Sequence, residues 1–418
     1  MSTAAPRERV HATYWLETGG DPARTAAIIA GEQSSGTFVA LAHETAELKE
    51  RSGARVERLE VIGETGTPSL PGAQPSDRYR QCVLELSWPV ENFGPSLTNL
   101  MSTIAGNLFE LYAVSGLKLT GLRLPPAFTS AFAGPAFGIA GTRQLAGVSQ
   151  GPLIGTIIKP SIGLSAEETA QQVRELIAGD IDFIKDDELQ SDGGRCPFED
   201  RVTAVMRVVN DAAERRGRKA MVAFNITGDL DEMRRRHDFV LAHGGTCVMV
   251  CVNSIGLVGA REIGRHTQLP IHGHRAGWGT LYRHPALGWD YAPWQQVWRL
   301  AGVDHLHVNG LDNKFTESNA SVIAAARAVL APLNSAAEMI AMPVFSSGQT
   351  GRQAAPTYAA LGCADLIHTA GGGIFGHPGG VPAGVEALRA AWRAAMAGTP
   401  LENEADHTPA LRTALGFW

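Results

Sequence analysis

The feature that most restricts the fold is a regular alternation of short apolar segments and helical patterns from about residue 150 onward. The strand-length segments are LIGTIIKP, IDFIKDD, AMVAFNI, TCVMVCV, PIHGHR, DHLHV, MPVFS and DLIHTAG. Helical patterns such as SAEETAQQVRELIAG and DEMRRRHDFVLAHGG lie between them. Eight buried strands separated by helices predict a (β/α)8 TIM barrel. An open doubly wound sheet is the alternative, but the GxGxxG turn typical of that fold is absent after the first strand.

The first part of the chain follows a different pattern. Strand-like ATYWLET, GTFVALA, QCVLELSWPV and GLKLTGLRLPP are mixed with helix-like DPARTAAIIAGEQ and LTNLMSTIAGNLFEL. Such mixing favours an α+β layer, which we expect to be of the ferredoxin-like kind. We therefore predict an N-terminal α+β domain over residues 1–145 and a catalytic barrel over residues 146–418 with a helical tail. The Pro- and Gly-rich stretch PPAFTSAFAGPAFGIAG is interpreted as a linker between them.

Charge and cysteine usage exclude several classes of partner. The net charge is −6 and no basic stripe is present, which argues against nucleic-acid binding. The five cysteines form no CxxC pair, and Cys247 and Cys251 lie in the apolar TCVMVCV segment, as buried thiols in a reducing cytosol would. No signal-like N-terminus and no apolar run of about 18 residues occurs. We expect a cytoplasmic protein without a membrane or nucleic-acid partner.

Polar side chains gather at the carboxyl ends of the predicted barrel strands. They include Lys159, the Lys185–Glu188 run, Asn225, His272, His274, Arg275, His305, His307, Lys314, Ser346 and the Gly371–Gly373 run. In a (β/α)8 barrel the carboxyl ends of the strands form the active face. We therefore expect these side chains to meet at one mouth.

The segment DFIKDDE is the sharpest of these motifs. Alternation along a strand sends Lys185 and Asp187 to one side, and Glu188 follows at the turn. Two neighbouring carboxylates suit a hard cation such as Mg²⁺. The lysine among them makes chemical sense if CO₂ converts its amine into a carbamate, which is a third oxygen ligand. A charged βα loop paired to nearby helices is an equally good interpretation of the residues alone.

Five further segments carry candidate functional residues, and three of them have a structural interpretation as well. HGHR and DHLHVNG suit proton transfer by His274 and His307 and a phosphate clamp at Arg275, or else structural histidines and a salt bridge. SSGQTG and AGGGIFGHPGG follow the seventh and eighth strands, where barrels often bind phosphate through backbone N–H groups. HVNGLDNKF is either a lid that carries Lys314 or a solvated loop.

Taken together, these motifs resemble the large subunit of RuBisCO and its non-carboxylating relatives, from about residue 12 to residue 395. The resemblance implies catalytic roles for Lys159, Lys185, His274, Lys314 and Asn107. It implies that carbamylated Lys185 binds Mg²⁺ together with Asp187 and Glu188. It implies substrate or phosphate binding by Glu32, Thr37, Arg275, His307, Ser346, Gly348, Gly371 and Gly372. Glu32 and Thr37 come from EQSSGTF, and Asn107 comes from TIAGNLF.

The sequence also departs from the family's pattern. Ser161 stands where the family has a second lysine in KPKLGL, and Trp278 replaces the histidine that follows HRA in carboxylating enzymes. Phe38 replaces the usual Trp, and Ser347-Gly348 replaces a Gly-Gly pair. These changes alter the pocket for a five-carbon bisphosphate and leave the metal motif intact. The chain therefore resembles a RuBisCO-like protein more than a ribulose-bisphosphate carboxylase.

The retained residues imply a reaction through a metal-bound enediolate formed from a phosphorylated keto sugar acid. Relatives in apiose catabolism act on 3-oxo-isoapionate 4-phosphate, either as decarboxylases or as transcarboxylase/hydrolases that yield 3-phosphoglycerate and glycolate. Lys159, His274 and Lys314 are all retained. Because a lid lysine suits a carboxylate created on the substrate, their retention favours transcarboxylation with hydrolysis.

Other activities stay open. One is a methylthioribulose-1-phosphate isomerase or a 2,3-diketo-5-methylthiopentyl-1-phosphate enolase of methionine salvage. Another is a catalytically silent sugar-phosphate binder, against which the intact KDDE argues. Family members build the active site between two subunits, so we expect a homodimer or an assembly of dimers with shared active sites and no small subunit.

Overall fold

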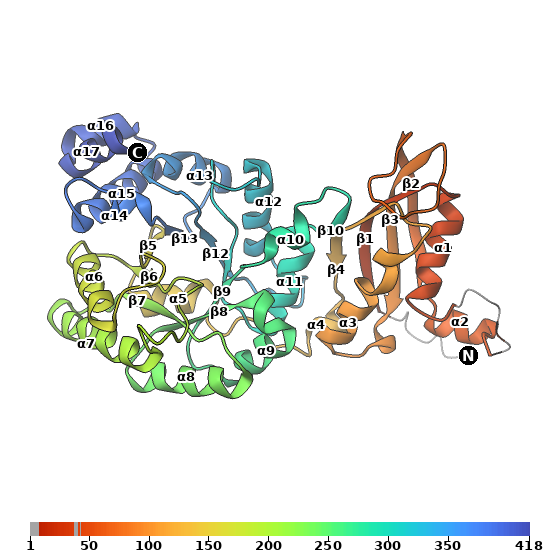
Figure 1. Cartoon of the computed structure of the whole chain (residues 1–418), viewed down its shortest axis with the longest axis horizontal. Helices are drawn as coiled ribbons and strands as arrows, with labels where there is room; N and C mark the ends of the chain where they lie inside the picture. Colours follow the sequence, from red (N-terminus) through yellow and green to blue (C-terminus); the bar gives the residue numbers. More distant parts are fainter. Residues whose placement is uncertain (1–7, 37–40, 42) are drawn as a thin grey trace. The chain divides into compact units, whose positions relative to one another are not determined.

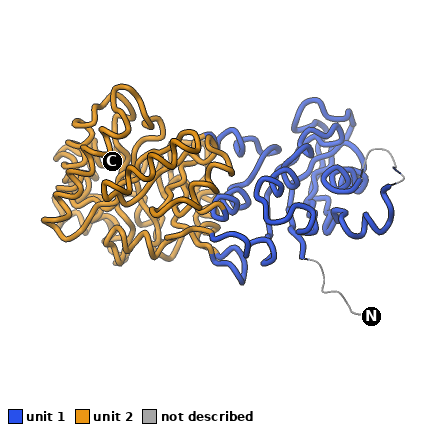
Figure 2. The backbone as a smooth tube through the Cα atoms, turned by 90° about the horizontal axis from the view of Figure 1, so that it is seen from below, with its two compact units in different colours: residues 1–133, 277–300, 332–338 blue, residues 134–276, 301–331, 339–418 orange. Residues whose placement is uncertain are grey.

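The computed structural model describes residues 8–36, 41 and 43–418. The chain forms two compact units (Figure 2). Unit 1 comprises Met1–Ala133, Gly277–Leu300 and Pro332–Glu338, and unit 2 comprises the remaining residues. The sequence predicts one domain boundary, between residues 145 and 146. That boundary stays a prediction.

Unit 2 contains the predicted barrel. Its strands are β5 (Leu153–Ile157), β6 (Phe183–Lys185), β7 (Met221–Asn225), β8 (Cys247–Cys251), β9 (Ile271–His274), β11 (His305–His307), β12 (Met342–Phe345) and β13 (Ile367–Thr369). All neighbours pair in parallel, and β13 pairs with β5, which closes the barrel. Each of the eight segments proposed from the sequence contains one of these strands, so the predicted (β/α)8 fold is confirmed.

The barrel interior is filled with apolar side chains at the amino-terminal ends of the strands. The cluster consists of Leu153, Phe183, Met221, Ala223, Cys247, Met249, Met342, Val344 and Ile367, with Ala146 of α5 (Gly138–Ala146). The stretch that the sequence indicated as a linker thus ends in a helix that packs against the core. Burial of Cys247 and Cys251 in β8 agrees with the interpretation of both residues as buried thiols.

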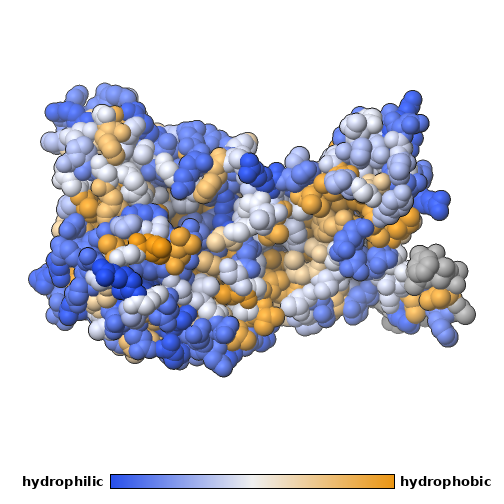
Figure 3. All heavy atoms as spheres, in the orientation of Figure 1, coloured by the Kyte–Doolittle hydropathy of each residue, from blue (hydrophilic) through white to orange (hydrophobic). Residues whose placement is uncertain are grey.

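Helices surround the barrel strands (Figure 1). They are α6 (Ala166–Ala178), α7 (Phe198–Arg216), α8 (Leu230–Ala242), α9 (Val252–His266), α12 (Asn319–Leu330), α13 (Ala354–Leu361), α14 (Gly372–Phe375) and α15 (Val381–Ala397). Capping boxes at Ser165 and Asp229 begin α6 and α8. Figure 3 shows mostly hydrophilic residues on the outer surface of α7 and α8, as expected for helices with one buried face.

The carboxyl-terminal segment docks on the barrel as α16 (Leu401–His407) and α17 (Pro409–Phe417). Leu411 is fully buried, and the indole Nε1 of Trp418 donates a hydrogen bond to the carbonyl of Gly373 at 3.1 Å. The carboxyl-terminal tail is therefore helical, and it is docked on the barrel. Among the described residues, no helix is long and apolar enough to cross a membrane.

Unit 1 is built on a five-stranded sheet in the order β10-β4-β1-β3-β2. Its strands are β1 (Arg9–Thr18), β2 (Arg55–Thr65), β3 (Tyr79–Pro89), β4 (Gly116–Arg123) and β10 (Leu287–Trp289). Its helices are α1 (Pro22–Glu32), α2 (Ala46–Ser52), α3 (Leu97–Ile104), α4 (Pro126–Thr129), α10 (Trp278–Tyr282) and α11 (Tyr291–Ala301), the last ending at the boundary with unit 2. The predicted α+β class of this region is confirmed.

Two strands of unit 1 were not expected. β2 forms one edge, and β10, which comes from the connection between barrel strands β9 and β11, pairs in parallel with β4 at the other edge. The strand proposed for GTFVALA falls largely on residues 37–40 and 42, which lie outside the described residues. Strands proposed for ATYWLET, QCVLELSWPV and GLKLTGLRLPP coincide with β1, β3 and β4.

Candidate active site

The carboxyl ends of β5, β6 and β9 bring together five of the predicted site residues. Lys159 follows β5, Lys185 ends β6 and is followed by Asp187 and Glu188, and His274 ends β9. The Lys159 ammonium lies 2.6 Å from Asp187, and Glu188 lies 3.7 Å from Lys185 and 3.4 Å from His274. The cluster therefore contains two amines, two carboxylates and an imidazole within one network.

Lys185 is the most buried member of this cluster. Its side chain is 1% exposed, and its Nζ donates a hydrogen bond to the carbonyl of Asp186 at 2.6 Å. Burial lowers the pKa of Lys185, although the neighbouring carboxylates of Glu188 and Asp187 act in the opposite direction. A lowered pKa increases the fraction of neutral amine, which is the form that reacts with CO₂.

Asp187 and Lys159 form a close pair at the barrel mouth. Burial raises the pKa of Asp187, but the hydrogen bonds from the Lys159 ammonium and the Leu189 amide outweigh it, so the net pKa is lowered. Lys159 also donates to the hydroxyl of Ser161 at 2.8 Å. This carboxylate is therefore held ionised, while Lys159 is fixed by two partners.

The turn after β6 is held by a network of Asp186, Asn225 and Arg201, of which Arg201 was not singled out from the sequence. Asp186 points away from the cluster and accepts from the guanidinium of Arg201 at 3.2 Å and from the backbone amide of Asn225 at 2.9 Å. The Asn225 side-chain amide donates to the carbonyls of Asp187 and Glu188. Since Arg201 is fully buried in α7, this network fixes the backbone from which both carboxylates project.

Three histidines form a second group beside the cluster. The Nε2 atoms of His272 and His307 lie 2.7 Å apart, and Nδ1 of His307 lies 3.1 Å from the hydroxyl of Ser346. The ring of His274 packs edge-on against His307 at a centroid distance of 4.5 Å. Burial is the largest cause that lowers the pKa of all three well below its usual range. Burial thus favours the neutral form of all three imidazoles near pH 7.

Arg275 lies next to His274 and is paired with a carboxylate. Its guanidinium lies 2.6 Å from Glu317, whose side chain is 1% exposed. The segment between Asn309 and Glu317 contains the predicted lid lysine. Lys314 is exposed, and its ammonium lies 5.4 Å from the centroid of the Phe315 ring. The lysine is thus on a surface loop that begins at the barrel mouth.

The two glycine-containing turns follow β12 and β13 as predicted. Ser347 and Gly348 both have positive φ angles, 73° and 82°, which Gly348 adopts without strain. A Cβ on Gly371 would lie 3.8 Å from Cγ of Lys159, so this turn is next to the cluster. Gly372 begins the short helix α14 and has open space where a Cβ would point.

The remaining predicted site residues are not in unit 2. Glu32 ends α1 and Asn107 begins a short 3₁₀ helix, Asn107–Glu110, and both are exposed in unit 1. Thr37 lies outside the described residues, as does Phe38. Their roles stay predictions.

Comparison with known proteins identifies the family. Residues 138–418 match the family model "Ribulose bisphosphate carboxylase large chain, catalytic domain", and residues 5–128 match the model of its N-terminal domain. The chain belongs to the RuBisCO large-chain family. It is an enzyme of the RuBisCO superfamily rather than an unrelated barrel that happens to share the motifs.

Several members of the family resemble the chain along nearly its whole length. A 3-oxo-isoapionate-4-phosphate transcarboxylase/hydrolase of Xanthobacter autotrophicus is 84% identical over 98% of this chain and 99% of its own. A 3-oxo-isoapionate-4-phosphate decarboxylase of Rhizobium etli is 42% identical over 96% and 97%. The crystal structure of a RuBisCO-like protein from Burkholderia fungorum has a TM-score of 0.93 and 45% identity, over 98% of this chain and 100% of that one.

Two departures from the RuBisCO pattern have a clear structural setting. Ser161 hydrogen-bonds the Lys159 ammonium and so acts directly on a predicted catalytic residue. Trp278 is 3% exposed and stacks on Tyr282 at a centroid distance of 5.4 Å, within an aromatic cluster of unit 1 that includes Trp294. The first change therefore concerns the cluster itself, and the second concerns packing in unit 1.

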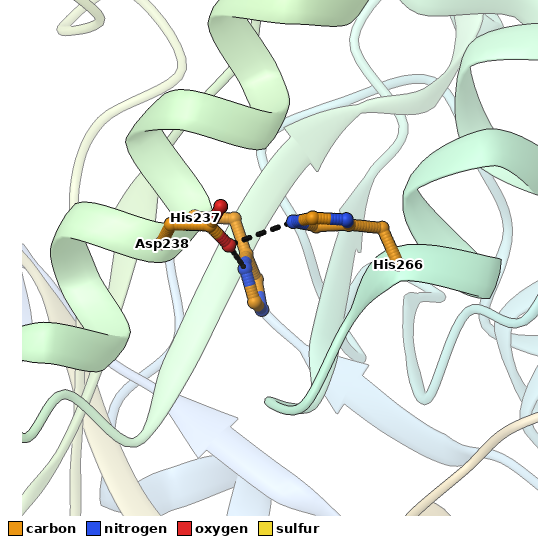
Figure 4. A group of neighbouring side chains, drawn as sticks. All are labelled: His237, Asp238 and His266. Atoms are coloured by element: carbon orange, nitrogen blue, oxygen red, sulfur yellow. Dashed lines mark hydrogen bonds and ion pairs between the residues drawn. The ribbon is translucent and has the colours of Figure 1, made fainter.

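A separate histidine group joins α8 to α9 (Figure 4). One oxygen of Asp238 lies 2.9 Å from Nδ1 of His237 and 2.7 Å from Nε2 of His266. Its composition suits a metal, but Nε2 of His237 accepts the backbone N–H of Gln268 at 3.2 Å. A metal-bound histidine normally donates its second N–H, so this arrangement instead places the ring proton on Nδ1, toward Asp238. The group is a hydrogen-bonded clamp between two helices.

Proposed function

We propose that this RuBisCO-like enzyme converts 3-oxo-isoapionate 4-phosphate by transcarboxylation and hydrolysis. The observation that carries the proposal is 84% identity over almost the full length of both chains to a relative with that name. The relatives named as decarboxylases of the same compound are 42% and 41% identical. The presence of Lys159, His274 and Lys314 in the same chain also supports a reaction that handles a carboxylate.

We further propose that the cluster after β6 binds Mg²⁺ once CO₂ has carbamylated Lys185. The donors fit a hard cation, since Asp187 is held ionised and Glu188 lies 3.7 Å from the Lys185 amine that would become the third oxygen ligand. When bound, Mg²⁺ supplies a Lewis acid that polarises a ketone oxygen of the substrate. The buried Lys185 amine, with its lowered pKa, is suited to react with CO₂ and release a proton.

We assign proton transfer, charge stabilisation and phosphate binding to the chain's own residues. Lys159, held by Asp187 and Ser161, is positioned to move a proton at the barrel mouth. The neutral His274 accepts the backbone N–H of Ala276 through Nδ1, so its ring proton lies on Nε2, 3.4 Å from Glu188, where it can be donated. Lys314 on the loop supplies a positive charge for the transferred carboxylate. Candidate phosphate ligands are the side chains of Arg275, His307 and Ser346 and the backbone amides of Gly348, Gly371 and Gly372.

The assembly is also a proposal. We infer a homodimer, or an assembly of dimers, in which Glu32, Thr37 and Asn107 of one subunit complete the barrel site of another, without a small subunit. Exposure of Glu32 and Asn107 in unit 1 leaves them available for such a role. The five free cysteines support the further proposal that the enzyme works in the reducing cytoplasm.

The deciding experiment is an assay of the purified enzyme, activated with Mg²⁺ and bicarbonate, on 3-oxo-isoapionate 4-phosphate. Products are followed by ³¹P and ¹³C NMR. We expect 3-phosphoglycerate and glycolate in equal amounts. Formation of a ketose phosphate and CO₂ would instead make the enzyme a decarboxylase. Consumption of methylthioribulose 1-phosphate, with no reaction of the sugar acid, would contradict the proposal and place the enzyme among the isomerases or enolases.

A further inference from the structure

Glu317 is a buried carboxylate that contacts both the candidate phosphate arginine and the loop that carries Lys314. Its Oε2 accepts from Arg275 at 2.6 Å and from the side-chain amide of Asn309 at 2.7 Å. Its Oε1 accepts from the hydroxyl of Ser321, in the first turn of α12, at 2.9 Å. A carboxyl group that is 1% exposed needs hydrogen-bond partners to offset its lost hydration, and this one has three donors.

The same residue closes the base of the loop. Asn309 and Glu317 are its first and last residues, and the Asn309–Glu317 hydrogen bond joins them. Inside the loop, the side-chain amide of Asn313 donates to the carbonyls of Gly310 and Glu317 at 2.9 and 3.1 Å. The exposed Lys314 follows directly. These hydrogen bonds hold the two ends of the loop close together, as in a compact Ω-type loop.

Asn309 connects this base to the turn after β12. It has a φ of 66°, which is uncommon for a residue other than glycine. Its side-chain oxygen accepts from the hydroxyl of Ser347 at 2.9 Å. Ser347 in turn accepts, through its backbone carbonyl, the amide of Lys314 at 3.3 Å. The carboxylate, the loop and the turn after β12 thus form one continuous hydrogen-bonded network.

We propose that Glu317 is a positioning residue that couples anion binding at Arg275 to the order of the loop over residues 309–317. The same carboxylate oxygen accepts from Arg275 and from Asn309 at the base of the loop, so the two hydrogen bonds meet at one atom. Through that shared oxygen, a change in the orientation of the guanidinium alters the anchor of the loop. The inference rests on the proposed function only in taking Arg275 as a ligand of the substrate's phosphate.

Limited proteolysis can test the coupling without turnover. An endoproteinase specific for lysine would cut the exposed loop after Lys314, giving fragments 1–314 and 315–418. Lys314→Arg identifies this cut by abolishing it. We expect inorganic phosphate, titrated until its effect levels off, to slow the cut in the wild-type enzyme. Glu317→Gln keeps the size of the side chain but loses its charge. This variant should be cut about tenfold faster, because loss of a hydrogen bond to a charged group shifts the equilibrium between the closed and the open loop by about that factor.

The decisive comparison is the effect of phosphate in the two proteins. We expect phosphate to change the cleavage rate of wild type but not of Glu317→Gln. Ser321→Ala is the matched control, because it removes a hydrogen bond to Oε1 and leaves both bonds to Oε2. Its response to phosphate should remain that of wild type. Thermal melting of each variant shows whether it is folded, and Glu317→Asp offers a second, charge-retaining probe if the glutamine variant unfolds.

Two results would overturn the proposal. One is a cleavage rate in folded Glu317→Gln equal to that of wild type, with the same response to phosphate. The other is a wild-type loop that phosphate leaves unaffected. Failure of the proposed function is a separate outcome, because a wild-type enzyme without activity on 3-oxo-isoapionate 4-phosphate can still show phosphate-dependent cleavage after Lys314.

Discussion

At the scale of single residues, Lys185 illustrates how burial prepares a side chain for chemistry. Its amine is 1% exposed, and its pKa is lowered mainly because the charged form loses its hydration. Lysines on the surface of the same chain have no comparable environment; Lys314 is exposed on a loop. Selective reaction of one lysine with CO₂ would follow from this difference.

The corresponding prediction concerns Lys185→Met, a substitution of similar length without an amine. We expect activity to fall by about a thousandfold or more, because loss of the carbamate removes a metal ligand and the Lewis acid contributes several kcal/mol. In ¹³C NMR with labelled bicarbonate, wild type should show a carbamate signal that the variant lacks. Full activity of the folded variant would exclude a carbamate at this position.

Ser161 is a second residue with a measurable effect. The Lys159 ammonium has two partners, Ser161 and Asp187, and Ser161→Ala removes one of them. We expect kcat to fall about tenfold, the usual effect of a lost hydrogen bond to a charged group, while KM for substrate changes little. Ser161→Thr keeps the hydroxyl and should restore most of the rate. Equal rates for the alanine and threonine variants would argue against positioning by this hydroxyl.

Sequence patterns predict these residues unevenly. Lys159, Lys185, Asp187, Glu188 and His274 stand at strand ends, where a barrel places side chains together, and the structure brings all five into one cluster. Partners such as Arg201 and Glu317 lie 15 and 42 residues from the groups they bind. Their pairing depends on how a helix or a loop packs against a distant strand end. A local sequence pattern carries no information about that packing.

At the scale of elements, buried strands were predictable and edge strands were not. The barrel strands are covered on both faces and therefore appear as continuous apolar runs. β2, with the sequence RVERLEVIGET, is largely exposed and carries charges typical of an edge. β10 has only three residues, and the segment around it is otherwise helical. Neither strand has an apolar run long enough to be recognised as a strand in the sequence.

The clamp between α8 and α9 gives a pH-dependent prediction. The hydrogen bond from His237 is the largest cause that lowers the pKa of Asp238, so the interaction stabilises the fold above the unfolded pKa near 4 and is lost as the pH falls through the folded value. Asp238→Asn should reduce stability at pH 7 by at most about 1 kcal/mol, because Asp238 is 58% exposed and screened by solvent.

Denaturant unfolding at pH 7 and pH 3 tests this prediction. The difference in stability between wild type and Asp238→Asn should shrink at the lower pH, where the carboxylate is increasingly protonated. Asp211→Asn on α7 is a suitable control, because Asp211 is also an exposed helical carboxylate and lies outside the first turn of its helix. If the difference in stability between wild type and Asp238→Asn is the same at pH 3 as at pH 7, the charge on Asp238 does not contribute to the stability of the fold.

At the scale of the whole molecule, the proposed sharing of active sites between subunits predicts complementation between inactive subunits. Asn107→Ala lies in unit 1 and Lys185→Met in unit 2. In a mixed dimer with shared sites, both substitutions fall into one site and the other site is intact. Random reassociation of equal amounts should restore about a quarter of wild-type activity. No recovery from a mixture that demonstrably exchanges subunits would mean that each site is built by a single chain.

The crossing of β10 from the barrel's connection into the sheet of unit 1 affects how such enzymes can be recombined. Residues Gly277–Leu300 follow β9 in the chain but belong to unit 1 (Figure 2). Within them, β10 pairs with β4. A chimera spliced once, between the first part of one homologue and the barrel of another, would combine a β4 and a β10 with different ancestries. Functional hybrids should therefore be enriched among those that inherit β4 and residues 277–300 from the same parent, a linkage that any single crossover between these two segments breaks.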